Sequence, residues 1–181
     1  TGSVGGSGGR GTGSGSMGRA SLRCATVSAE ATTLDAGPMT LAGTVGGTGT
    51  AVTLVHGFAQ NRNCLGPLAE ELTRRCRVLR PDAPGHGGST LHAAADLATG
   101  AGLLAATGGA GVYIGYSMGA RLCLRTALDH PDDVRALVLI GATPGIEDSE
   151  ERRERQRADS ALAERLERIG LDAFVQEWLA L

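Results

Sequence analysis

Short apolar runs alternate with helical segments through the middle of the chain. The runs resemble strands buried on both faces of a sheet, are rich in Val, Ile and Leu, and occupy residues 51–55, 76–80, 111–115 and 134–140. Segments whose apolar residues recur at helical spacing lie between them, at 65–75, 91–107 and 118–128. This alternation predicts an α/β fold, with a mostly parallel, doubly wound sheet and crossover helices on both faces.

The two ends of the chain differ in composition from this core. Residues 1–20 contain little but Gly, Ser, Thr and Arg, so we expect them to be disordered. Residues 21–145 are expected to form the N-terminal part of the core, including a turn at 35–38. In residues 146–181 a charged helix and then an amphipathic helix replace the alternation, and we interpret them as the start of a helical cap.

Charge and cysteine content exclude several classes of protein. The net charge of −2 provides no electrostatic footprint for nucleic acid or for an anionic membrane. The chain lacks a run of 18 apolar residues, so we expect no membrane span. Four Cys residues are scattered without metal-ligand spacing, which predicts reduced thiols in a cytoplasmic protein without a metal site.

The pentapeptide Gly115-Tyr116-Ser117-Met118-Gly119 lies between a predicted strand and a predicted helix. In this context it predicts a nucleophile elbow, whose sharp turn lifts the Ser hydroxyl above the strand ends and whose glycines remove clashing Cβ atoms. The N-terminus of the following helix adds a positive potential there. Ser117 is therefore the candidate nucleophile; the alternative is a tight turn with an idle Ser.

The run His56-Gly57-Phe58 ends an earlier strand, where an enzyme with a nucleophile elbow needs a second oxyanion donor. We expect the backbone N–H groups of Phe58 and Met118 to form the oxyanion hole. The His56 side chain is expected to bond backbone in its turn.

A loop rich in glycine follows the next strand, at residues 82–89. We expect Asp82 and His86 to hold this loop together, and a catalytic role for His86 is the alternative.

Three motifs in this order, His-Gly-Phe, Asp-x-Pro-Gly-His-Gly and Gly-Tyr-Ser-Met-Gly, resemble the α/β-hydrolase superfamily over residues 50–145. A narrower likeness covers residues 115–181. It rests on Arg121, four residues after the nucleophile, and on features further along the chain: Pro144-Gly145-Ile146, Arg155, Asp159, Phe174 and Trp178. These are similar to the family of 2-succinyl-6-hydroxy-2,4-cyclohexadiene-1-carboxylate synthases of menaquinone biosynthesis.

This resemblance implies a lyase that eliminates pyruvate from a succinyl-bearing cyclohexene dicarboxylate, with a Ser-His-Asp triad as base and no metal or cofactor. Guanidinium groups are the expected partners of such a polycarboxylate. By position, the resemblance makes Arg121 and Arg155 substrate-carboxylate ligands and Trp178 a pocket wall. Tyr116, the neighbour of the nucleophile, is expected to bind substrate as well. The alternatives are a solvated helix position for Arg121 and an ordinary pair with Glu151 for Arg155.

The triad base is not evident in the chain. The only His after Ser117 is His130, which follows the predicted helix at the far edge of the sheet. The order in this fold is Ser, acid, His, so we expect the acid and the base beyond Leu181. We accordingly expect this chain to be inactive by itself, to lack the last strands of the sheet, and to expose an apolar edge that favours association.

Two other functions compete with the synthase. The first is a serine carboxylesterase or thioesterase of the same fold, which has no need of two guanidinium groups near its nucleophile. The second is an inactive fragment or binding module. Both enzyme hypotheses imply a small-molecule partner.

Overall fold

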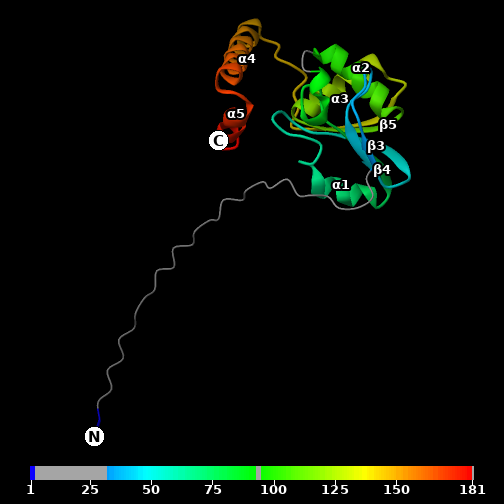
Figure 1. The fold of residues 1–181 in the computed structure, drawn as a ribbon, viewed down its shortest axis with the longest axis horizontal. Coiled ribbons are helices and arrows are strands. Elements are labelled where there is room, and N and C mark those ends of the chain that lie inside the picture. Colours follow the sequence, from blue (N-terminus) through cyan, green and yellow to red (C-terminus); the bar gives the residue numbers. More distant parts are fainter. Residues whose placement is uncertain (3–31, 93–94, 181) are drawn as a thin grey trace.

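A mixed sheet of six strands forms the centre of the molecule (Figure 1). The computed structural model describes residues 1–2, 32–92 and 95–180, so most of the segment expected to be disordered lies outside the described residues. The order across the sheet is β1-β2-β4-β3-β5-β6. The strands are β1 (Thr32–Leu34), β2 (Gly43–Gly46), β3 (Thr50–Val55), β4 (Cys76–Pro81), β5 (Gly111–Tyr116) and β6 (Val134–Ile140).

The four strands expected from the apolar runs are parallel to one another. β3 pairs with β4 and β5, and β5 pairs with β6. β2 runs antiparallel to both β1 and β4, which makes one edge of the sheet antiparallel. The predicted α/β fold with a mostly parallel sheet is confirmed.

One face of the sheet is covered by α1 (Gly66–Thr73). Ala69 of this helix is buried against Val52, Leu54 and Val78 of the two central strands. These side chains alternate with those of the opposite face along each strand, as the two-residue period of a strand requires.

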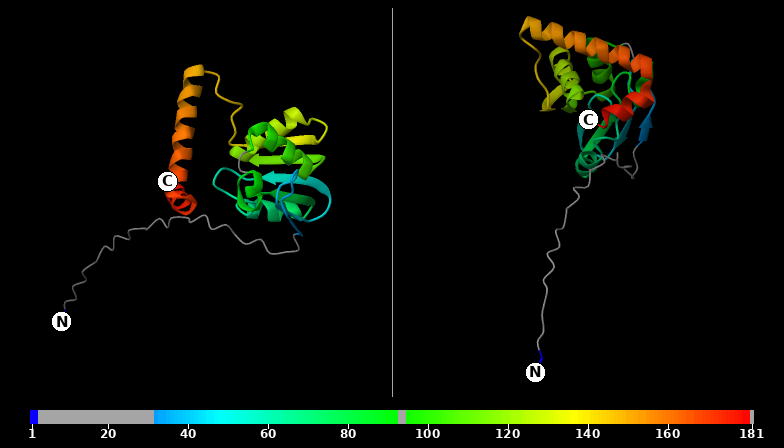
Figure 2. Two further views of the ribbon diagram at one scale, coloured as in Figure 1. Left: turned by 45° about the horizontal axis from the view of Figure 1, so that its top comes forward. Right: turned by 90° about the vertical axis from the view of Figure 1, so that its left-hand side faces the viewer.

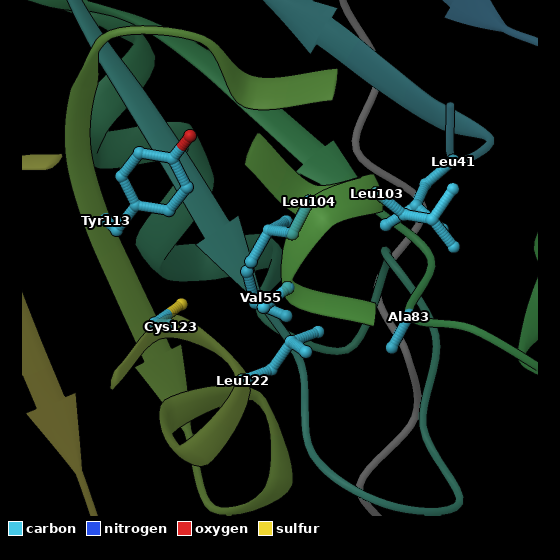
Figure 3. Packing of buried hydrophobic residues seen from close by; sticks show 9 residues of the cluster. Leu41, Val55, Ala83, Leu103, Leu104, Tyr113, Leu122 and Cys123 are labelled. Carbon is cyan, nitrogen blue, oxygen red and sulfur yellow. The ribbon is translucent and has the colours of Figure 1, made fainter. Parts of the chain in front are cut away.

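The other face carries α2 (Leu97–Gly108) and α3 (Met118–Asp129). Val55 is fully buried there and lies among Leu104, Leu122 and Cys123 (Figure 3). Burial raises the pKa of the Cys123 thiol to about 12, so it behaves as a small apolar group.

Two boundaries differ from the sequence expectation. The helix expected from residue 91 begins at Leu97, because the Asp96 carboxylate accepts the Thr99 N–H at 2.7 Å and caps the helix there. The turn expected at 35–38 lies two residues later, where Gly37 and Thr40 exchange two backbone hydrogen bonds.

Two helices, α4 (Ser149–Ile169) and α5 (Leu171–Trp178), stand off from the sheet at the end of the chain (Figure 2). Asp148 caps α4 by accepting the N–H groups of Glu150 and Glu151. No residue of α4 is buried, whereas Phe174 of α5 is 4% exposed. Among the described residues, no helix is long and apolar enough to cross a membrane.

Candidate active site

Ser117 occupies the turn between β5 and α3. Its φ of 52° lies in the left-handed region, which a non-glycine residue adopts only at a cost of about 1–3 kcal/mol. Its N–H donates to the carbonyl oxygen of Ile140 at 2.8 Å, and this bond fixes the turn to the end of β6. The backbone therefore has the strained strand-to-helix geometry of a nucleophile elbow.

Backbone crowding explains the two flanking glycines. A Cβ atom on Gly115 would lie 2.5 Å from the Cα of Ala120, and one on Gly119 would lie 2.5 Å from the carbonyl oxygen of Val55. Both neighbours are backbone atoms, which cannot move aside as the end of a side chain can. The start of α3 thus approaches β3 and β5 more closely than a residue with a side chain would permit.

A cleft of about 490 Å³ lies over the elbow, between the sheet and the two C-terminal helices. The core side is formed by Ser117, Met118, Phe58 and Arg121. The helical side contributes two polar residues and five apolar ones: Arg155, Asp159, Leu162, Ala163, Leu166, Phe174 and Trp178. All predicted site residues except Tyr116 therefore line one cleft.

Tyr116 lies outside the residues that line this cleft. Its side chain, 39% exposed, lies beside Gly57, where a Cβ atom would be 3.0 Å from the Tyr116 Cδ1. Side chains that are adjacent in an extended segment point to opposite sides, so a residue next to Ser117 in sequence need not face the same cleft.

Aromatic rings connect the core to α5. The Phe58 and Trp178 ring centroids are 5.3 Å apart in an edge-on arrangement, and the Phe174 ring is 6.2 Å from Phe58. Phe174 and Trp178 stack on each other at 5.9 Å. Phe58 therefore has two roles in the cleft. Its backbone N–H is an expected oxyanion donor, and its ring contacts the aromatic side chains of α5.

The two predicted guanidinium ligands differ in their partners. Nε of Arg155 donates to Oδ1 of Asp159 at 2.8 Å, so its ion pair is not with Glu151, the partner that the sequence suggested. Both side chains are about half exposed. Arg121 is exposed, and within the described part of the chain its side chain makes no hydrogen bond or ion pair.

His56 is 1% exposed and bonds backbone through both ring nitrogens, as expected. The N–H of Ala83 donates to Nε2 at 3.0 Å, which leaves the ring proton on Nδ1 to donate to the carbonyl oxygen of Gly57 at 2.8 Å. Desolvation by burial lowers the His56 pKa from 6.5 to about 4. His56 is thus a neutral residue that joins the ends of two strands.

Asp82 organises the loop that follows β4. Its buried carboxylate accepts the backbone N–H groups of Arg62 and Gly88 at 2.7 and 2.8 Å, and pairs with the Arg62 guanidinium at 3.1 Å. Nδ1 of His86 lies 2.9 Å from the carbonyl oxygen of Pro84 in the same loop. The sequence prediction anticipated the roles of Asp82 and His86 but not that of Arg62, which the chain's many Arg residues concealed.

Ser117 and His130 lie at opposite ends of α3. The former precedes the first residue of the helix and the latter follows its last. The 12 residues of the helix span about 18 Å, so the two side chains are far beyond hydrogen-bond reach. Among the residues that the structure describes, no cluster of His, Cys, Asp or Glu has the arrangement of a metal site.

The apolar lining from α4 was not anticipated from sequence. Leu162, Ala163 and Leu166 face the cleft together with Arg155 and Asp159. The spacing of these five residues could have predicted this, because positions i, i+4, i+7, i+8 and i+11 share one face of a helix. The surrounding charges made this helix resemble one that is solvated on all sides.

Comparison with known proteins agrees with this geometry. The alpha/beta hydrolase fold family matches residues 50–175. The chain therefore belongs to the α/β-hydrolase fold family.

The similar proteins include synthases and an esterase. A 2-succinyl-6-hydroxy-2,4-cyclohexadiene-1-carboxylate synthase from Klebsiella pneumoniae is 34% identical over 129 residues, which cover 68% of this chain and 51% of the relative. A pimeloyl-[acyl-carrier protein] methyl ester esterase from Methylococcus capsulatus is 37% identical over 99 residues, covering 54% of this chain and 39% of the relative.

Among solved structures, MenH from S. aureus superposes with a TM-score of 0.64 at 26% identity, covering 75% of this chain and 55% of that one. The chain spans about half the length of the curated synthases that it matches.

Proposed function

We propose that the protein is a lyase that eliminates pyruvate to form 2-succinyl-6-hydroxy-2,4-cyclohexadiene-1-carboxylate in menaquinone biosynthesis. The observation that carries the proposal is the presence of two guanidinium groups, Arg121 and Arg155, in the cleft that contains Ser117. A substrate with several carboxylates requires such partners, whereas a neutral ester does not. The similarity to synthases at 31–37% identity supports the same activity.

The position of each residue in the cleft suggests its proposed role in the reaction. An elimination needs a base that takes a proton from carbon and a site that holds the carboxylates while pyruvate departs. Ser117 is the proposed catalytic residue, activated by a His and an acid from outside residues 1–181. Arg121 and Arg155 would hold the substrate, and α4 and α5 would act as its cap.

The proposed oxyanion hole uses the backbone N–H groups of Phe58 and Met118. Within the described part of the chain neither group donates a hydrogen bond to protein. Unpaired, preorganised donors of this kind stabilise negative charge that develops on a substrate oxygen. They would serve an enolate in the elimination or a tetrahedral intermediate in ester hydrolysis.

A serine esterase or thioesterase is the second candidate function. It is favoured by the esterase relative and by the apolar lining that Leu162, Ala163 and Leu166 contribute to the cleft. Pyruvate release and p-nitrophenyl ester hydrolysis, measured side by side on the protein expressed from the complete gene, separate the two. We expect pyruvate release that Ser117→Ala abolishes and that Arg121→Met and Arg155→Met reduce. Rapid ester turnover without pyruvate would reject the synthase.

We further propose that residues 1–181 alone are inactive, because among the described residues no side chain forms a hydrogen bond with the Ser117 hydroxyl. A fluorophosphonate probe labels only an activated serine. We expect no labelling of the 181-residue chain beyond that of its Ser117→Ala variant. Strong labelling that depends on Ser117 would contradict this proposal.

A further inference from the structure

Asp159 holds one edge of the Arg155 guanidinium at the cleft. The hydrogen bond from Nε to Oδ1 uses one of the five N–H groups of this side chain. The other four, on Nη1 and Nη2, donate to no protein atom within the residues that the structure describes. The terminal fork of Arg155 is therefore available to a ligand.

The geometry of the guanidinium group explains why it matters that Nε is bound while Nη1 and Nη2 are available. Nη1 and Nη2 together present two parallel N–H groups that match the two oxygens of a carboxylate. A long side chain without a partner must be ordered when it binds, and this ordering reduces affinity. Asp159, one helical turn away, already holds Arg155 through Nε. The side chain is therefore partly ordered before a ligand binds, and less affinity is lost.

Among the residues that the structure describes, Asp159 is the one acidic residue that lines the cleft over Ser117. Across the cleft Arg121 has no comparable tether among the described residues. We propose that Asp159 is a positioning residue, which orients Arg155 so that its terminal fork receives a substrate carboxylate. The inference rests on the proposed function, in which Arg155 binds such a group.

The carboxylate of Asp159 has two effects that substitutions can separate. Its oxygen accepts the hydrogen bond that orients Arg155, while its negative charge opposes an anionic ligand. Asp159→Asn keeps an acceptor oxygen and removes the charge, whereas Asp159→Ala removes both. If positioning dominates, the Ala variant binds a dicarboxylate about two- to tenfold more weakly, and the Asn variant binds at least as tightly as the unchanged chain.

Trp178 provides the readout. It is the only Trp of the chain and it lines the cleft, so its fluorescence reports occupancy there. The probe is succinate, and succinamide serves as the neutral control ligand. Glu150→Ala is the matched protein control, because Glu150 pairs with Arg153 on the same helix but does not line the cleft. Far-UV circular dichroism checks that the helix content is unchanged.

The outcomes distinguish this inference from the proposed function. Tighter succinate binding by both Asp159 variants would overturn it, because Asp159 would then be only a competing counter-ion. Unchanged binding by Asp159→Ala, with binding lost in Arg155→Met, would overturn the positioning role and leave the carboxylate site intact. No succinate binding by the unchanged chain, or full binding by Arg155→Met, would overturn both.

Discussion

A Cβ atom on Gly119 would lie 2.5 Å from the carbonyl oxygen of Val55, the last residue of β3. The first turn of α3 therefore rests directly on the backbone of the strand that leads to Phe58. This contact fixes the turn at Ser117 relative to the proposed oxyanion donors. It also makes the glycine more sensitive to substitution than its conformation alone would suggest.

We predict that Gly119→Ala lowers the free energy of unfolding by about 1–3 kcal/mol, because backbone must shift to admit the methyl group. Gly102→Ala is the control within α2. Its nearest neighbour is the Nε2 of His130 at 3.9 Å, an ordinary contact, so this change should raise stability by about 0.5–1 kcal/mol. Urea denaturation of both variants measures the difference. Equal effects would contradict the crowding at Gly119.

The buried ion pair of Asp82 and Arg62 should contribute far more to the free energy of unfolding than an ion pair on the surface does. Asp82→Ala leaves two N–H donors and a guanidinium without their acceptor, and we predict a loss of about 2–4 kcal/mol. The exposed pair of Glu71 and Arg74 provides the matched comparison, and Glu71→Ala should change stability by less than about 0.5 kcal/mol. Similar losses in both variants would show that burial of Asp82 is unimportant.

His56 should make stability depend on pH between 4 and 6.5. The unfolded chain protonates this residue near pH 6.5, whereas the folded chain does so only near pH 4. The neutral His56 therefore contributes fully to the free energy of unfolding above pH 6.5, and this contribution is lost as the pH falls from 6.5 to 4. The loss is on the order of 3 kcal/mol at pH 4.

Two measurements test the His56 prediction. The stability difference between the unchanged chain and His56→Gln should shrink as the pH falls from 7 to 4. Imidazole nitrogen shifts should show a neutral ring with its proton on Nδ1 at pH 6. A pH-independent difference, or a proton on Nε2, would contradict the hydrogen bonds described for this side chain.

Local patterns were sufficient to predict the parallel part of the sheet and the sharp strand-to-helix turn at Ser117. The period and composition of residues 51–55 and 134–140 identify buried strands, and the spacing of Gly115, Ser117 and Gly119 specifies the turn. The start of α2 was misplaced because an Ala-rich run continues the helical pattern upstream of Leu97. Asp96 was the available signal, since its side chain is a strong helix cap.

Contacts between distant segments could not be predicted in the same way. Phe58 and Trp178 are separated by 119 intervening residues, and no local pattern pairs them. The partner of Arg155 was similarly ambiguous, because Glu151 and Asp159 both lie four residues away. The antiparallel edge formed by β1 and β2 depends on short, weakly apolar strands whose direction the sequence does not specify.

The contact of Phe58 with α5 predicts a fluorescence change. Phe58→Ala should release Trp178, which is 37% exposed, and shift its emission to longer wavelength. The denaturation midpoint of the sheet should change little, because Phe58 is itself 38% exposed. Leu171→Ala is the control in the same helix, where a side chain 65% exposed should leave the emission unchanged. An unshifted emission in Phe58→Ala would show that other contacts dock α5.

The edge strand β6 predicts self-association of the chain. β6 pairs only with β5 among the described strands, and Val138, Leu139 and Ile140 are 44%, 40% and 42% exposed. Consecutive apolar residues point to both faces, so the edge combines unpaired backbone groups with apolar surface, which favours pairing with another chain. Sedimentation velocity should show species larger than a monomer whose fraction grows with protein concentration. Leu139→Lys should shift the population toward monomer because edge charges oppose strand pairing, whereas Leu171→Lys should not; a monomer at every concentration would contradict the prediction.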